Sequence, residues 1–561
     1  MITPRLRRLL ILSSIILFVI YSLVSVSSSS SKESTNSKIN SIRQNIFSYF
    51  NENDNNSLLR HISQSKIDLG DDLLNKELQS HIKDSKRNKK SQNFYSKMFK
   101  ILNEQKFKIP ALDLIGKADS RDSELIWSKK KLSEFLKLDP IQIENLQKIH
   151  QEVFNELPYK FPKDLYKGEG IVMIGGAQFS WLSLLSIKSL RSFGSKLPIE
   201  LIIPTIEEYE QELCEIILPS LNGKCILLDN VFGEEVMSTM KFSGYQYKSL
   251  ALIASSFDSI LFMDSDNILV SNPDKLFYSK PFINHGMVLW PDYWLRTTSP
   301  LFYDIANINI TNKRVRMGKW PMLESKIIPE NQLDQVPLHD LEGSIPDLSS
   351  ESGQLMIRKS DHLKTILLSF FYNLYGPNFF YKLLSQGQSG EGDKDTFIAA
   401  AIKSNEKFYQ VKSEIQSFGW FDDGNFQGVS MGQRSPIEDY EQYERLLLNS
   451  KNENFKGFEE NFDTRLASVF TVHANFPKFN PYLLWKENKL KNSKGEEIRL
   501  YSDISKFLVE PFDFELVQYK RMKSLLCDLK INLKYFENVD KESICKFIDN
   551  HIDFLIKNPV T

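Results

Sequence analysis

Two carboxylates, Asp264 and Asp266, follow directly after the apolar run 260–263 in the segment ILFMDSDNILVSNP. The run predicts a buried strand, and Asn272-Pro273 ends the segment with a turn signal. Like charges that leave a protein core need a partner, and oxygen ligands of this kind commonly bind a hard divalent cation. The alternative is an Asx turn, in which Asp266 and Asn267 only cap the end of the strand.

Strands and helices alternate in the chain that leads to this pair. Two amphipathic helices are expected first, around Ser123 to Leu136 and Ile141 to Leu157. The apolar runs that follow predict strands at 168–176, 199–204, 224–229 and 259–263, and helices between them at 179–194, 206–217 and 247–257.

This alternation is typical of an α/β fold with a mainly parallel sheet and helices on both faces. Ligands of such sheets bind beyond the carboxyl ends of the strands, which is where Asp264 and Asp266 fall. The chain contains no Walker-A or G-x-G-x-x-G loop for phosphate binding. A metal that links the two carboxylates to a diphosphate leaving group therefore fits best, as a nucleotide-sugar transferase requires.

The N-terminus predicts a compartment. Arg5, Arg7 and Arg8 precede an apolar run at 9–26, which we expect to be a transmembrane signal anchor with residues 1–8 in the cytoplasm. A cleaved signal peptide is the alternative, because small residues around Ser25 to Ser28 offer a cleavage site. Residues 27–109, rich in Ser, Asn, Lys and Asp, predict a lumenal stem, and 110–561 a lumenal catalytic domain.

Composition and cysteines agree with a secreted or lumenal globular protein. The 70 basic and 71 acidic residues leave a net charge of −1, without the basic excess of a nucleic-acid binder. The chain contains no C-x-x-C pair, so a zinc site is not expected. The four cysteines allow three pairings, of which the short loops favour Cys214 with Cys225 and Cys527 with Cys545. Asn55 and Asn309 begin N-glycosylation sequons.

Several long motifs resemble one family of enzymes. They are, in order, SILFMDSDNILVSNPDKLF, GMVLWPDYWLRTTSPLFYDIA, IPDLSSESGQLMIRK, LLSQGQSGEGDKDTFIAAA and VHANFPKFNP. Together they are similar to the fungal Golgi alpha-mannosyltransferases of the Mnn family, most of all to the alpha-1,2-mannosyltransferases that branch cell-wall mannan. The resemblance covers 110–561. It implies a GT-A fold, which is a Rossmann-type mixed sheet, with a GDP-mannose donor, Mn²⁺ and a mannan or N-glycan acceptor.

The resemblance also implies roles for individual residues. Asp266 is expected to bind the metal directly, with Asp264 reaching the metal or the donor's ribose and sugar. His473 resembles the late histidine that completes the metal site in GT-A enzymes, and a structural histidine beside a turn is the alternative. The remaining residues expected to contact the nucleotide sugar are Gly175, Gln178, Lys248 and Lys478. A lone helical lysine such as Lys248 is more often simply solvated.

A second group of acids stands in the glycine-rich segment GEGDKDTFIAAA. Glu391, Asp393 and Asp395 are expected to act on the acceptor hydroxyl or on positive charge at the anomeric carbon, although Asp393 could be only the N-cap of the helix that follows. Glu351 and Gln354 precede another buried strand. We expect Gln354 to be a catalytic residue, and the small residues Ser352 and Gly353 to let the backbone lie against the sugar. A plain strand-entry turn explains that segment equally well.

These observations predict a retaining alpha-1,2-mannosyltransferase anchored in the Golgi membrane as a single-pass type II protein, with membership of a Golgi mannosyltransferase complex. Rival hypotheses are an alpha-1,3-mannosyltransferase, a transferase of the same fold with another sugar nucleotide, and a catalytically inactive glycan-binding member of such a complex. The presence of Asp264, Asp266 and His473 together argues against the inactive protein.

Overall fold

The computed structural model describes residues 70–105, 107–121, 125–240, 242–452 and 455–560, with side chains from residue 84 onward. The chain divides into two compact units, and nearly all described residues belong to the unit formed by 76–527 and 531–561. No helix in this described part of the chain is long and apolar enough to cross a bilayer. The expected anchor, 9–26, and the Asn55 sequon lie outside the described residues.

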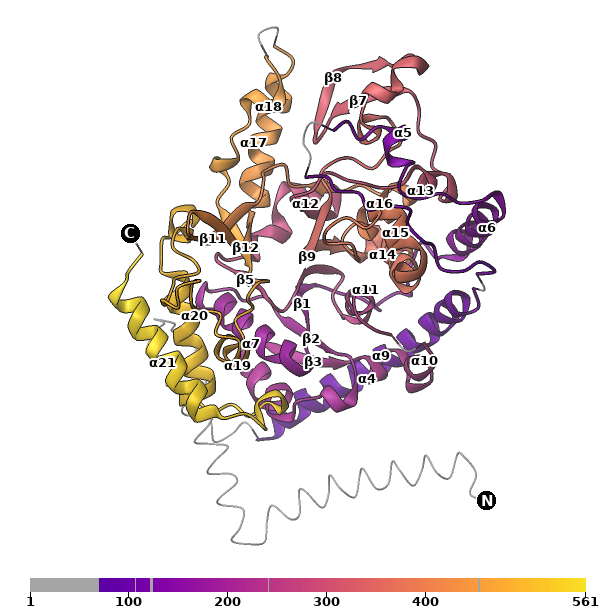
Figure 1. Cartoon of the computed structure of the whole chain (residues 1–561). Helices are drawn as coiled ribbons and strands as arrows, with labels where there is room; N and C mark the ends of the chain where they lie inside the picture. Colours follow the sequence, from indigo (N-terminus) through magenta and orange to yellow (C-terminus); the bar gives the residue numbers. More distant parts are fainter. Residues whose placement is uncertain (1–69, 106, 122–124, 241, 453–454, 561) are drawn as a thin grey trace, which may run out of the picture. The chain divides into compact units, whose positions relative to one another are not determined.

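A seven-stranded mixed sheet forms the centre of the unit (Figure 1). Its strands, in spatial order, are β10 (Tyr409–Gln410), β6 (Met287–Pro291), β9 (Ser350–Arg358), β4 (Ser259–Met263), β1 (Glu169–Ile174), β2 (Ile199–Ile203) and β3 (Gly223–Leu227). β4, β1, β2 and β3 run parallel, as the alternation of strands and helices predicts, whereas β9 runs antiparallel to both β4 and β6. The predicted mixed α/β architecture is therefore confirmed.

The other strands of the described residues form two smaller antiparallel sheets. One has the order β11 (Gln416–Asp422), β12 (Asn425–Arg434), β13 (Val469–His473) and β5 (Asn267–Leu269), and the other pairs β7 (Lys313–Met317) with β8 (Trp320–Ile327). Three residues, 264–266, separate the end of β4 from the start of β5, and both aspartates lie in this loop. The central sheet and the second sheet therefore meet there.

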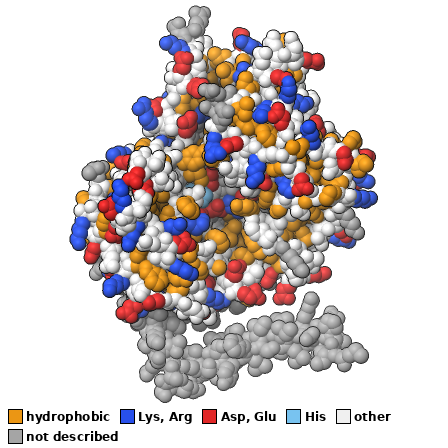
Figure 2. Space-filling view, viewed as in Figure 1, with side chains coloured by type: hydrophobic (Ala, Val, Ile, Leu, Met, Phe, Trp, Pro, Cys, Tyr) orange, Lys and Arg blue, Asp and Glu red, His pale blue; other side chains and the backbone are white. Residues whose placement is uncertain are grey.

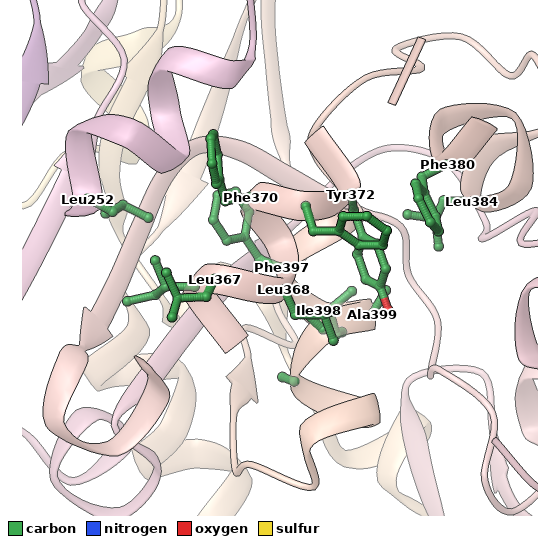
Figure 3. Packing of buried hydrophobic residues seen from close by; sticks show 14 of the residues in the cluster. Leu252, Leu367, Leu368, Phe370, Tyr372, Phe380, Leu384, Phe397, Ile398 and Ala399 are labelled. Carbon is green, nitrogen blue, oxygen red and sulfur yellow. The ribbon is translucent and has the colours of Figure 1, made fainter. Parts of the chain in front are cut away.

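Alternate residues of β4 enter different parts of the core. Ile260 and Phe262 join a hydrophobic cluster with the helices on one face of the sheet, while Leu261 and Met263, also buried, point to the opposite face. Figure 3 shows the cluster, in which side chains of α11 (Gln246–Ala254), α14 (Lys359–Leu374) and α16 (Thr396–Ser404) pack together. This packing fixes the strand end that carries Asp264.

The other helices surround these layers, and most of the predicted ones are present. Their bounds are α6 (Pro140–Glu156), α7 (Ala177–Ser192), α8 (Leu218–Ser220), α9 (Leu228–Phe232), α10 (Glu234–Met240), α12 (Lys280–His285), α13 (Pro300–Ile305), α15 (Tyr381–Ser385), α17 (Pro436–Asn449), α18 (Phe458–Asn461), α19 (Pro481–Lys486), α20 (Phe514–Met522) and α21 (Lys541–Lys557). The helix expected at 206–217 is a short 3-10 turn followed by a π-helical segment, Leu213–Ile217.

The helix expected over Ser123 to Leu136 is wrong for most of its length. Only α5 (Lys129–Leu132) is helical in the described residues there, and it ends at the C-cap Ser133. Leu132 and Leu136 are four residues apart, a spacing typical of one face of a helix, and both are buried. A turn after α5, and not a continuous helix, brings the two side chains into the core.

The boundary expected for the stem also needs correction. α4 (Gly70–Asn103) is a long helix whose last turns bury Tyr95, Met98, Phe99 and Leu102 in the main core. The segment is polar on average, which led to the prediction of a stem, because its buried apolar residues are few and lie near its C-terminal end. The folded unit therefore begins well before residue 110.

Both disulfides favoured by the short loops are present. Cys214 bonds to Cys225, with Cα atoms 5.3 Å apart, and Cys527 bonds to Cys545, with Cα atoms 5.8 Å apart. The first connects the π-helical segment to β3, and the second connects the end of the α20 region to α21.

Candidate metal and nucleotide-sugar site

The pairing of β5 with β13 brings His473 to the two aspartates. Asn267 of β5 is the direct partner of His473, and the Ala474 backbone N–H donates to the Asp266 carbonyl at 3.0 Å. On the other side, the Asp264 N–H donates to the Gly353 carbonyl of β9 at 2.7 Å. The loop with the aspartates is thus held between the central sheet and the second sheet.

Asp264, Asp266 and His473 form a cluster that could hold a divalent cation. One ligand atom from each lies within 4.8 Å of the others, and His473 Nε2 is 3.4 Å from Asp266 Oδ1. Two carboxylates and an imidazole are a donor set that suits hard to borderline divalent metals. Lys478 reaches the same carboxylate, with its ammonium on Asp266 Oδ2. In Figure 2, acidic and basic side chains meet in a hollow near the centre of the visible face.

Glu351 and Gly353 of β9 fix the orientation of His473. Glu351 Oε1 lies 3.1 Å from His473 Nδ1 and accepts the Gly353 N–H at 2.6 Å. A Cβ at Gly353 would lie 2.7 Å from that carboxylate oxygen and 2.9 Å from Nδ1, so only glycine leaves space for both groups. A carboxylate on one imidazole nitrogen turns the other nitrogen toward a metal, an arrangement common in metalloproteins.

Burial and neighbouring charges shift the pKa values of the two aspartates in opposite directions. Burial raises the pKa of Asp264 to about 6 against the opposing effect of Lys248. Burial would also raise the pKa of Asp266, but His473 and Lys478 hold it below its usual range. Burial would lower the pKa of His473, yet Asp266 and Glu351 raise it to about 10. A cation at this site must therefore displace positive charge from around Asp266.

Lys248 links Asp264 to the second group of acids. Its ammonium lies 2.9 Å from Asp264 Oδ2 and 3.3 Å from Asp393 Oδ2, and it donates to the Ser352 carbonyl at 3.1 Å. The side chain is 10% exposed, so the expectation of a solvated helical lysine does not apply. Burial raises the pKa of Asp393, although Lys248 opposes the shift. Asp393 thus lies beside the metal cluster, and the Lys248 ammonium connects it to Asp264.

Asp393 is not the cap of α16. That position belongs to Asp395, whose side chain makes no capping hydrogen bond. Instead, Asp395 is 2% exposed, pairs with the fully buried Arg296 at 2.6 Å and accepts the Ser350 N–H at 3.0 Å. Asp395 therefore holds the segments before β9 and α16 together, and the catalytic role expected for it stays a prediction.

Glu391 and Gln354 also have structural partners. Glu391 accepts the Gly387 N–H at 2.6 Å and so closes the glycine-rich loop. Gln354 is fully buried, and its Oε1 accepts from Asn267 Nδ2 at 3.0 Å and from the Thr471 hydroxyl. Its position ties β9 to β5 and β13, and the catalytic role expected for Gln354 stays a prediction.

The remaining predicted contacts lie at the same edge of the sheet. Gly175 follows β1 one residue beyond the level of Asp264, and a Cβ there would lie 2.9 Å from Ile203 Cδ1, so a side chain at this position would make Ile203 shift. Gln178 is the second residue of α7, and its Oε1 accepts a hydrogen bond from Asn480 Nδ2 at 3.4 Å. The sequon residue Asn309 is exposed in the loop between α13 and β7.

Glu351 and Ser352 of β9 support the side chains of the site. Ser352 donates to Asp393 Oδ1 at 3.2 Å and accepts from Lys248 at 3.0 Å, while Glu351 supports His473. Their partners could not be read from the local sequence, because these contacts depend on the antiparallel insertion of β9 beside β4.

Comparisons with known proteins place the chain in a family. A family model described as "Mannosyltransferase putative" matches residues 168–435. Alpha-1,2-mannosyltransferase MNN23 of Candida albicans is 45% identical over 74% of this chain and 76% of its own length. Alpha-1,2-mannosyltransferase MNN2 of Saccharomyces cerevisiae is 39% identical over 76% of this chain and 77% of its own.

Solved structures of glycosyltransferases are more distant. GlyE of Streptococcus pneumoniae matches with 15% identity and a TM-score of 0.25 over 44% of this chain and 45% of its own. Mouse xyloside xylosyltransferase 1 matches with 15% identity and a TM-score of 0.26 over 43% of this chain and 85% of its own. It is the identity to the fungal sequences, sustained over three quarters of each chain, that decides the relationship: the protein belongs to the fungal alpha-1,2-mannosyltransferase family of the Mnn type.

Proposed function

We propose that this protein is a retaining alpha-1,2-mannosyltransferase that moves mannose from GDP-mannose to a hydroxyl of mannan or of an N-glycan outer chain, with Mn²⁺ as cofactor and a GT-A catalytic fold. The observation that carries the proposal is the cluster of Asp264, Asp266 and His473 at the end of β4, in a chain of this family. An alpha-linked donor that yields an alpha-linked product implies retention of configuration.

The side chains of the cluster have separable tasks. Asp264, Asp266 and His473 would hold Mn²⁺, which when bound would neutralise the diphosphate leaving group. Glu351 keeps His473 turned toward the site through the Nδ1 contact. Lys478, one-third exposed beside Asp266, adds positive charge where the diphosphate would lie. Asp393, held by Lys248 and Ser352, supplies a buried carboxylate for the sugar or the acceptor.

We further propose that the protein is a single-pass type II protein of the Golgi membrane, with a lumenal catalytic domain, in a mannosyltransferase complex. Support comes from Arg5, Arg7 and Arg8 before the apolar run 9–26, and from two disulfides, which suit an oxidising lumen. Protease added to intact Golgi vesicles should leave residues after the anchor protected. A mature chain that begins near Ser27 would contradict the uncleaved anchor.

The activity is tested by incubating the lumenal part with GDP-mannose, Mn²⁺ and an alpha-1,6-mannan acceptor, followed by linkage analysis of the product. We expect alpha-1,2-linked mannose, and we expect Asp266→Asn and EDTA each to abolish transfer. An alpha-1,3 linkage, or use of another sugar nucleotide, would identify a different transferase of the same fold. Binding of mannan without transfer would indicate the inactive glycan-binding alternative, and full activity of Asp266→Asn in excess chelator would refute the metal site.

A further inference from the structure

A cleft separate from the metal cluster lies beside the β11–β12 hairpin. We call it the hairpin cleft; its volume is about 670 Å³, and its walls come from 416–421, Phe426, the segment 497–507 and the end of α21. Figure 1 shows the hairpin between α17 and the C-terminal helices α20 and α21. The volume lies within the range that ligand sites of proteins occupy.

Aromatic rings dominate the floor and the rim of the hairpin cleft. On the floor, Phe418 is 3% exposed and packs against Phe507 with ring centroids 5.8 Å apart. On the rim, Phe421 is 69% exposed and Phe426 is 46% exposed, with centroids 5.4 Å apart, and Trp420 stands beside them. Such exposed rings are unfavourable in water and mark a surface that binds a ligand with apolar faces.

The charged side chains of the lining already have polar partners within the protein. The pairs are Glu497 with His551 at 2.7 Å, Arg499 with Asp513 at 2.6 Å, and Asp503 with Lys506 at 2.9 Å. A charged ligand would have to compete with these contacts, so the lining favours an uncharged ligand. Ser417, Ser502 and Asn558 add hydroxyl and amide groups. Aromatic faces next to neutral polar groups match a carbohydrate, whose rings have apolar C–H faces and polar edges.

One residue of the cleft lining, Ser417, lies on the face of the second sheet that carries His473, whereas the floor residue Phe418 follows it in β11 and points to the opposite face. Ser417 pairs with Met431, and Met431 pairs with His473, so their side chains emerge on the same face. Neighbouring strands are about 4.8 Å apart, which puts Ser417 and His473 about 10 Å apart. The Ser417 hydroxyl also contacts the Tyr293 hydroxyl at 2.9 Å, and Asp292, next to Tyr293, pairs with Lys394 beside Asp393.

We propose that the hairpin cleft is an accessory subsite that binds a neutral stretch of the acceptor polysaccharide next to the residue that receives mannose. The proposal rests on the proposed function for the identity of the polysaccharide as mannan. A subsite of this kind contributes affinity for long acceptors and does not touch the reacting atoms, so its loss raises KM for long acceptors alone.

The test compares long and short acceptors. Trp420→Ala and Phe421→Ala remove rim rings that the core does not need, and Trp485→Ala, at a tryptophan that is 37% exposed outside the cleft, is the matched control. With a long alpha-1,6-mannan oligosaccharide, we expect KM to rise about tenfold in the rim variants, since truncating a tryptophan anchor commonly costs that much, with kcat unchanged. With a methyl mannoside acceptor, too short to reach the cleft, we expect no change. Equal effects on both acceptors, or no effect on the long one, would overturn the proposal.

Calorimetry separates this proposal from the catalytic one. The long oligosaccharide is titrated into the wild-type protein, Trp420→Ala and Trp485→Ala without donor. Weaker binding by Trp420→Ala alone supports the cleft even if the wild-type protein transfers no mannose, in which case only the proposed function fails. Equal binding by all three proteins overturns the proposed subsite even if mannose transfer is normal.

Discussion

Replacing Gly353 by alanine should disable the metal cluster although no predicted ligand is itself substituted. The new Cβ would lie 2.7 Å from Glu351 Oε1, 2.9 Å from His473 Nδ1 and 3.0 Å from His473 Cε1. Contacts this short cannot persist, so the carboxylate, the imidazole or both must move. Because the Glu351 contact orients His473, the movement changes the direction of Nε2 toward Asp266.

We expect Gly353→Ala to lower both the affinity for the metal and the stability of the fold. Disturbing the partner of a metal-bound histidine typically lowers metal affinity about 10- to 100-fold, which corresponds to roughly 1.4 to 2.8 kcal/mol. Overpacking a buried site costs the fold about 1 to 3 kcal/mol. The second effect is tolerable for a domain of ordinary stability, so the variant should remain folded while it loses metal.

Calorimetry of Mn²⁺ binding, a transfer assay over a range of Mn²⁺ concentrations and a thermal melt together distinguish these effects. We expect weaker Mn²⁺ binding and transfer that recovers in part at high Mn²⁺. Gly116→Ala is the matched control, because a Cβ at Gly116 would meet only Phe135 Cδ1, at 3.7 Å. Wild-type Mn²⁺ affinity in Gly353→Ala, or an equal loss in Gly116→Ala, would refute the role given to Gly353.

Three further predictions concern buried groups. Asp393→Asn should abolish transfer but keep Mn²⁺-dependent GDP binding, measured by calorimetry, and near-normal transfer would return Asp393 to a structural role. Asp395→Asn should lower the free energy of unfolding in urea by about 3 to 5 kcal/mol, because Arg296 would stay buried without its partner; a loss below 1 kcal/mol would contradict this. Burial lowers the pKa of His150 from 6.5 to about 3, so the folded state resists protonation, and stability present above pH 6.5 is lost as pH falls toward 3. At pH 5 the loss is about 2 kcal/mol, and His150→Gln should remove that part of the acid sensitivity in urea unfolding at pH 7 and pH 5.

Local patterns in the sequence were sufficient for the four parallel strands β1 to β4 and for the helices α6, α7 and α11. Continuous apolar runs mark strands buried on both faces, and Asp264 and Asp266 follow the strongest of these runs. The two short cysteine loops likewise favoured the disulfides that the structure contains. Local patterns failed at α4 and α5, where a few buried residues sit in polar surroundings and a turn buries the same side chains as a helix.

The sequence by itself determined which residues are available for chemistry: the paired aspartates at a strand end, the late histidine and the acids of the glycine-rich loop. Only the tertiary structure decided what each acid does. Asp393 and Asp395 are two residues apart, yet Asp393 faces Lys248 near the metal cluster, whereas Asp395 is neutralised by Arg296, which lies 99 residues earlier in the chain. The role of a buried carboxylate depends on the charge that folding places beside it, and that partner comes from strand pairings such as β9 with β4 and β13 with β5, which no local pattern encodes.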